Sequence, residues 1–209
     1  NIHGEEFNIS ALEFSVDQKN NIVIGEGDVE VTDSEGKLIK GDKVTYEKSK
    51  EFLLVEGSVE VIDVEGNVLK SDMATYDKKK EIIITYENSE LILKEGYKLI
   101  SNKILYNTIK RIMSSNQNSI LTDSDGNIVT VSMFQYHLEK NLFSSIGKIK
   151  VIDINKNKYF FKELHVDTKK KEMIGSDVSV ILDQENFGVS KESDPRFVAN
   201  NILMSDNKT

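Results

Sequence analysis

The stretch "GDVEVTDSEGKLIKGDKVTYEKSKEFLLVE", from Gly27 to Glu56, decides the fold because the chain repeats it at once. The next thirty residues, from Gly57 to Tyr86, read "GSVEVIDVEGNVLKSDMATYDKKKEIIITY". Glycine, aspartate and a Thr-Tyr pair recur at the same places in both copies. A repeat of fixed length indicates a stacked architecture in which each unit contacts only its neighbours.

The thirty-residue step continues through most of the 209 residues, and four positions of the unit are apolar in every copy. These four columns are Phe14, Val44, Ala74, Ile104, Phe134 and Leu164; Val16, Tyr46, Tyr76, Tyr106, Tyr136 and Val166; Val23, Leu53, Ile83, Met113, Phe143 and Met173; and Val31, Val61, Leu91, Leu121, Val151 and Ile181. We therefore expect equivalent side chains to stack on one face, without an insertion or deletion between units.

Within a unit the apolar residues alternate with polar ones. In "EFLLVEGSVEVID", Leu53, Val55, Val59 and Val61 share one parity. A period of two predicts half-buried strands of about ten residues. Connections such as "TDSEG" and "DKKK" are too short for a parallel crossover, so consecutive strands must be antiparallel. A glycine in the first kind of turn, at positions 36, 66, 96 and 126, supplies a positive φ.

These features predict an all-β fold of roughly a dozen antiparallel strands. No helix-period segment is available to cover the apolar face, so the sheet must fold over on itself. The rhythm stops near Asp183, which predicts a repeat domain over residues 1–183. The tail, residues 184–209, contains the single proline, Pro195, and is expected to be a closing cap or a connector.

Composition narrows the function classes. The chain has 27 basic and 35 acidic residues, a formal net charge of -8, whereas nucleic-acid binding needs clustered Lys and Arg. We therefore predict no nucleic-acid partner. The lysine clusters at residues 78–80 and 169–171 are interpreted as solvated turns.

There is no cysteine, hence no thiolate site, and no apolar run reaches the roughly 18 residues of a membrane-spanning helix. The first ten residues lack the features of a signal peptide, as expected if one has been removed.

Catalytic patterns are missing from the sequence. No G-x-S-x-G, H-E-x-x-H or P-loop motif occurs. His3, His137 and His165 are the three histidines, and His137 and His165 do not share a column, so they need not face each other. We predict no enzymatic activity, no metal site and no cofactor.

The repeated units, of the form "GDVEV…EGKLIKGDKVTYEKSKEFLLVEG", resemble the OstA-like domains of the lipopolysaccharide-transport (Lpt) system, which occur in LptA, LptC and the periplasmic part of LptD. The resemblance covers about Phe14 to Asp183 and rests on G-x-V-x-V followed by D-x-x-x-Y. The tail segment "SDPRFVANNI" is similar to the LptD segment that leads to the outer-membrane barrel, which favours the N-terminal domain of LptD over LptA. LptD domains typically carry cysteines, and this chain has none.

The resemblance implies a β-jelly-roll (β-taco) in the periplasm of a Gram-negative bacterium. Its interior would receive the acyl chains of lipopolysaccharide, and an edge strand would pair with an LptA-like protein. A C-terminal outer-membrane barrel and its lipoprotein partner would follow.

The candidate lipid-lining residues are those that the columns and the strand parity turn inward. They are Val29, Val31, Val44, Tyr46, Leu53, Val55, Val59, Val61, Tyr76, Ile83, Leu91, Ile104, Tyr106, Leu121, Phe134, Tyr136, Phe143, Ile149 and Val151. The same residues could equally fill a plain core, and the tyrosines could simply occupy the crease of the fold.

Three alternatives remain open at this point. A soluble LptA-like bridge protein would share the fold and the lining. A structural β-stack or adhesin segment would have a filled interior and bind no ligand. A carbohydrate-active parallel β-helix fits less well, because such coils use three short strands rather than two long ones.

Overall fold

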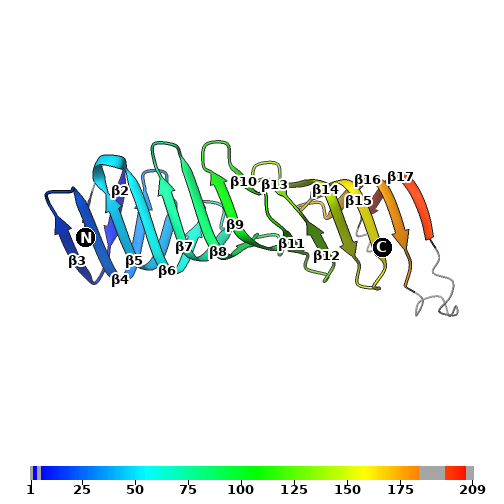
Figure 1. Cartoon of the computed structure of the whole chain (residues 1–209), viewed down its shortest axis with the longest axis horizontal. Coiled ribbons are helices and arrows are strands. Elements are labelled where there is room, and N and C mark those ends of the chain that lie inside the picture. The colour runs from blue at the N-terminus through cyan, green and yellow to red at the C-terminus, as the bar shows by residue number, and fades with distance from the viewer. Residues whose placement is uncertain (1, 4–5, 184–195, 206–209) are drawn as a thin grey trace. The chain divides into compact units, whose positions relative to one another are not determined.

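The computed structural model describes residues 2–3, 6–183 and 196–205, and all its long elements are β-strands. In this part of the chain the seventeen strands and one 3₁₀ turn are β1 (Ile2–His3), β2 (Phe7–Ser10), β3 (Glu13–Asp17), β4 (Ile22–Asp33), β5 (Leu38–Glu47), η1 (Lys48–Lys50), β6 (Phe52–Ile62), β7 (Val68–Asp77), β8 (Ile82–Ile92), β9 (Lys98–Asn107), β10 (Ile112–Ser115), β11 (Ser119–Thr122), β12 (Ile128–Val131), β13 (Phe134–His137), β14 (Leu142–Ile152), β15 (Lys158–Asp167), β16 (Glu172–Ile181) and β17 (Arg196–Ser205) (Figure 1). No helix among the described residues is long and apolar enough to cross a membrane.

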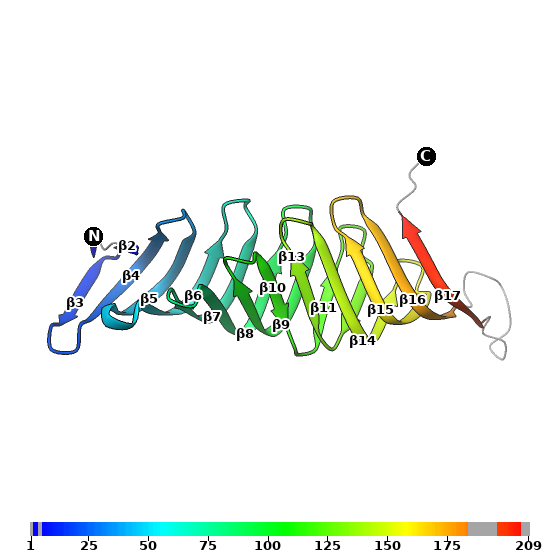
Figure 2. The same cartoon turned by 90° about the horizontal axis from the view of Figure 1, so that it is seen from above.

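The chain forms two compact units. Unit 1 contains residues 1–94 and 100–111, and unit 2 contains residues 95–99 and 112–209. In both units, neighbouring strands pair in antiparallel fashion, as β4 with β5 in unit 1 and β14 with β15 in unit 2 (Figure 2). The predicted fold class, a repeat-built antiparallel β-jelly-roll, is confirmed.

The long strands of unit 1 shift register near their middle, with the extra residue in β4, β6 and β8. In β4 the first half pairs with β3 and the second half with β2, and the register with β5 shifts between Glu26 and Val29. The strands thus contribute to two walls. We call the wall that contains β3 and the first half of β4 the first wall, and the wall that contains β2 the second wall.

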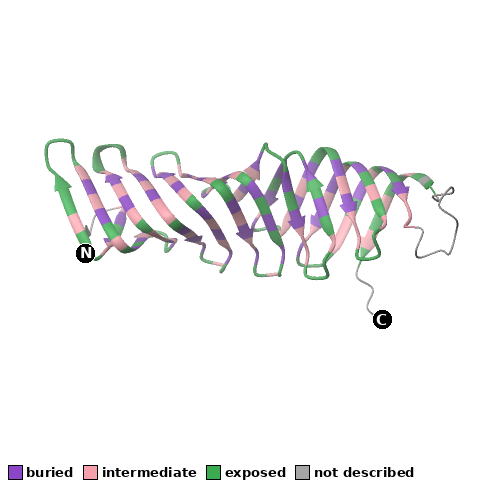
Figure 3. Ribbon diagram, turned by 60° about the horizontal axis from the view of Figure 1, so that its bottom comes forward, coloured by how far each residue is buried: buried purple, intermediate pink, exposed green. Residues whose placement is uncertain are grey.

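The two walls of unit 1 face each other. The ring of Phe7, on the second wall, lies edge-on to the rings of Tyr46 and Tyr76 on the first wall, with 5.4 Å between centroids in each pair. The sheet therefore folds over on itself, as its single apolar face requires. Buried and exposed residues alternate along the strands as predicted from the period of two (Figure 3).

The predicted turn chemistry is confirmed. The glycines at positions 36, 66, 96 and 126 all have φ between 88° and 96°. The fifth member of the column, Lys156, adopts φ 65° without being glycine. A non-glycine residue in this region is uncommon, so the repeat geometry of the turn overrides the local preference.

Two expectations about the strands need correction. Strand number exceeds the predicted dozen, partly because β10–β11 and β12–β13 are separate half-strands where other repeats have one continuous strand. The second correction concerns Ile181, the last member of the fourth apolar column, which was expected to lie on the same buried face as the other members. In β16, Val178 and Val180 are buried, whereas Ile181 is partly exposed.

The reason for the error at Ile181 is a missing bulge. Between β14 and β15 the register shifts between Ile146 and Ile149, as it does in the earlier repeats. Between β15 and β16 the pairing runs from Glu163–Ser176 to Phe160–Ser179 with equal steps on both strands. Because side chains alternate every residue, losing one bulge residue moves all later residues to the other face.

The tail is described only in part. Arg196–Ser205 forms β17 and pairs antiparallel with β16, whereas residues 184–195 and 206–209 lie outside the described residues. The predicted boundary at residue 183 stays a prediction.

Candidate functional site

The predicted lining residues all lie in the interior of the two units. Each of the nineteen is buried, with a relative exposure of 7% or less. In unit 1, Leu53, Ile83 and Ile104 have no exposed surface at all. A plain core would show the same burial, so burial alone does not identify a binding site.

The open edge of the fold is the place where a ligand could enter. We call it the seam: the line along which the hairpin turns of the first wall approach those of the second wall. The turns of the second wall include residues 33–37 and 63–67 in unit 1 and residues 123–127 and 153–157 in unit 2. The seam differs between the two units.

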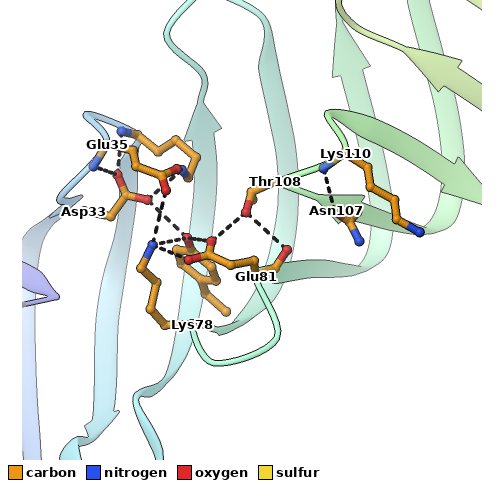
Figure 4. A network of polar contacts seen from close by, with 9 residues as sticks. Asp33, Glu35, Lys78, Glu81, Asn107, Thr108 and Lys110 are labelled. Atoms are coloured by element: carbon orange, nitrogen blue, oxygen red, sulfur yellow. Dashed lines mark hydrogen bonds and ion pairs between the residues drawn. The ribbon is translucent and has the colours of Figure 1, made fainter.

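In unit 1 a polar network closes the seam. We call Asp33, Glu35, Tyr76, Lys78 and Glu81 the clasp. The Tyr76 hydroxyl lies 3.1 Å from Asp33 Oδ2 and 3.0 Å from Glu81 Oε2, and Lys78 Nζ lies 2.6 Å from Glu81 and 3.8 Å from Glu35 (Figure 4). The turns of both walls are thereby joined.

Further contacts extend this closure. Lys37 Nζ forms ion pairs with Asp33, at 2.8 Å, and with Glu35. Thr108 Oγ1 donates a hydrogen bond to Glu81 Oε2 at 2.7 Å, and Arg111 of the first wall pairs with Glu65 of the second wall. The Arg111–Glu65 pair thus joins the two walls at a second place along the seam of unit 1.

The electrostatics of the clasp fit ionised carboxylates. Burial alone would raise the pKa of Asp33, but the hydrogen bonds and charge of Lys37 outweigh it and hold that pKa below its usual value. Burial alone would also raise the pKa of Glu81. Hydrogen bonds from Lys78, Thr108 and Tyr76 outweigh this effect and lower the pKa of Glu81 below its usual value. Burial and the charges of Asp33 and Glu81 raise the pKa of Tyr76, so the tyrosine stays a neutral donor.

One prediction about the lysines is wrong. The interpretation of residues 78–80 as a solvated turn holds for Lys79 and Lys80, whose side chains are 54% and 72% exposed. The side chain of Lys78 is only 6% exposed, because the turn of the second wall covers it. The local sequence carries no sign of that distant turn.

In unit 2 an open cavity of about 470 Å³ lies at the seam. Its apolar surface includes Leu121, Val129 and Val151 of the second wall, and Val166 and Met173 of the first wall. Tyr97, Ile154 and Met204 also line the cavity. Of the nineteen predicted lining residues, Leu121 and Val151 border this cavity.

The rim of the cavity is polar. It is formed by the second-wall turns, with Asp123, Asp125 and Asp153, and by Lys171 of the first wall. Lys171 Nζ lies 3.1 Å from Ser124 Oγ and so links the first wall to the second wall at the rim. Asp123 and Asp153 accept hydrogen bonds from their own turns, through the backbone N–H groups of Asn127 and Asn157. Their first role is therefore to shape the rim.

An apolar cavity with a polar rim can hold an apolar chain whose head remains in water. Volumes of about 300–1,000 Å³ are usual for small-ligand sites. Among the described residues no group of three or more His, Cys, Asp or Glu side chains is arranged to hold a metal ion.

Sequence reasoning missed the cavity as a distinct place. It also missed Met204 and Tyr97, which lie outside the four apolar columns. A signal was present in the column of Tyr46, Tyr76, Tyr106 and Tyr136, because its next member is Val166.

Comparisons with known proteins add one finding. No protein-family model matches the chain, and no curated protein matches it. Among solved structures, the fold is similar to the crystal structure of LptH, the LptA homologous periplasmic component of the conserved lipopolysaccharide transport device from Pseudomonas aeruginosa. The TM-score is 0.45 at 20% sequence identity, over 50% of this chain and 77% of LptH.

Proposed function

We propose that this chain transports lipopolysaccharide in the periplasm by sheltering acyl chains inside its folded-over sheet. The observation that carries the proposal is the cavity of unit 2, which has an apolar floor, a polar rim and an opening at the seam. An acyl chain gains about 0.8 kcal/mol for each methylene removed from water, so an apolar cavity suffices to hold it without covalent chemistry.

The charges at the rim are consistent with binding in which the acyl chain of the lipid, rather than its headgroup, supplies the affinity. Asp123, Asp125 and Asp153 outnumber Lys171, and the whole chain has a formal net charge of -8. Such a rim does not attract an anionic headgroup. The sugars and phosphates of lipopolysaccharide would thus remain in solvent above the seam.

Partners follow from the same proposal. A strand of an LptA-like protein would pair with an edge strand of this chain, a known mode of peptide and protein recognition. The last strand, β17, exposes Val198 and Leu203 at 81% and 63%. In the finer form of the proposal the chain is the N-terminal domain of an LptD protein, which assembles lipopolysaccharide at the outer membrane and precedes a barrel with its lipoprotein partner.

A purely structural stack has one observation in its favour. The interior side chains of unit 1 are buried, and the clasp joins the two walls at its seam. A stack that served only as a spacer would look like unit 1 throughout, whereas unit 2 contains the cavity.

The test is to look for the bound lipid. The chain, produced in the periplasm of a Gram-negative host and purified without detergent, is denatured and examined by mass spectrometry. We expect lipid A-bearing lipopolysaccharide at a substantial fraction of one molecule per chain. An unrelated β-sandwich protein from the same host serves as the control. Lipid at or below the level of that control would contradict the proposal and favour the structural stack.

A further inference from the structure

The tyrosine column explains where the cavity lies. Tyr46, Tyr76, Tyr106 and Tyr136 are all buried, with exposures between 1% and 7%. Each large ring fills the interior just inside the seam, on the first wall. Thirty residues after Tyr136 the column continues with Val166, which borders the cavity of unit 2.

The contacts of Tyr76 show which interaction is missing where the column has Val166. The Tyr76 hydroxyl reaches Asp33, 43 residues earlier, at the tip of the second wall. The same step from Val166 leads to Asp123, which lies on the cavity rim. Burial and the charge of Asp63, also 43 residues earlier, raise the pKa of Tyr106 to about 12, which places that tyrosine in a similar environment.

The polar part of the clasp also differs between repeats, because the position of Lys78 is Thr108, Leu138 and then Thr168 in the following units. Lys78 and Glu81 correspond to Thr168 and Lys171. Thr168 donates to the Asn141 carbonyl oxygen of the neighbouring first-wall turn, at 3.1 Å, so it does not bridge the seam as Lys78 does. The change from Tyr136 to Val166 therefore removes the large ring at a repeat that also lacks a pair equivalent to Lys78 and Glu81.

We propose that Val166 is the residue that determines where the apolar ligand binds, and that the ligand occupies one position, in unit 2, rather than the whole interior. This inference rests on the proposed function. It assigns unit 1 the role of a closed scaffold and makes the ligand a single apolar chain at a time. The lining predicted in unit 1, such as Leu53 and Val55, then acts as core.

The test restores the missing ring. In Val166→Tyr the added ring enters the cavity and its hydroxyl comes near Asp123. We expect the affinity for Nile red, an uncharged apolar dye, to fall at least about tenfold, equal to about 1.4 kcal/mol. The melting temperature should stay the same or rise. His165→Tyr, one residue away on the outer face, is the matched control and should bind the dye as the wild type does.

A second variant keeps the inference testable if Val166→Tyr does not fold. Met173→Phe fills the cavity from the next strand and copies Phe143, its equivalent one repeat earlier. It should also weaken dye binding, by a smaller factor. Wild-type affinity in a folded Val166→Tyr protein, or in Met173→Phe if the first variant misfolds, would overturn the inference and leave the proposed function standing. A wild-type protein that binds neither dye nor lipid would overturn both.

Discussion

Replacing Val61 by proline is expected to destabilise unit 1 severely. Val61 lies in β6, opposite Ile39 of β5 on one side and Leu69 of β7 on the other. Because a paired strand lies on each side, the N–H of Val61 faces a hydrogen-bonding partner strand whichever way it points. Proline removes that donor and leaves a buried carbonyl unsatisfied. We expect a loss of about 3 kcal/mol from the lost hydrogen bond together with the displaced side chain. For a chain of this size, this loss corresponds to a fall in melting temperature of about 6–12 °C, measured by far-UV circular dichroism.

A proline three residues later is the matched control. Val64 occupies the second position of the turn from Asp63 to Gly66, whose ends are joined by the hydrogen bond from Gly66 N to the Asp63 carbonyl oxygen. Proline is favoured at this position, and Val64 is 63% exposed. Val64→Pro should melt close to the wild type. Equal stability of both proline variants would show that the strand register is wrong.

Replacing Lys78 by methionine is expected to cost about 3 kcal/mol, because removing one partner of a buried ion pair leaves the other charge uncompensated. Lys78 lies 2.6 Å from Glu81, and the two side chains are only 6% and 16% exposed. Methionine keeps most of the length of the side chain. The loss in the free energy of unfolding therefore comes from removing the charge rather than from creating a cavity. Urea unfolding at neutral pH gives the free energy of unfolding.

Two further variants separate the buried charge from the surface. Lys80, 72% exposed, pairs with Asp77, and Lys80→Met should change stability by less than about 1 kcal/mol. The double variant Lys78→Met with Glu81→Gln should recover most of the loss, since no carboxylate then lacks its cation. If Lys78→Met and Lys80→Met were equally mild, the clasp would contribute nothing to closing unit 1.

The regular part of the fold could be predicted because two periodicities coincide. Alternation along each strand turns Leu53 and Val55 inward, and the thirty-residue step places Ile83 at the equivalent position of the next repeat. Both are local or nearly local properties of the sequence. The error at Ile181 arose where the repeat loses a bulge, a change that leaves the apolar pattern looking intact because Val180 is as apolar as Ile181.

The seam could not be predicted in the same way. The contacts of Asp33 with Tyr76 and of Glu35 with Lys78 join turns 43 residues apart, and they exist only once the sheet has folded over. A lysine in a turn rich in Lys is normally solvated, so the burial of Lys78 has no local sign. The interruption at Val166 was visible in the sequence, but it gained a meaning only when the tyrosines were seen to fill the interior.

The most direct test of the account is site-specific photo-crosslinking in cells at two adjacent residues of β16. Met173 borders the cavity, and Ile174 points outward with 51% of its surface exposed. A photoreactive amino acid at position 173 should capture lipopolysaccharide, and the same amino acid at position 174 should capture little or none. Equal capture at both positions, or capture only at position 174, would contradict the claim that the apolar chain binds between the two walls.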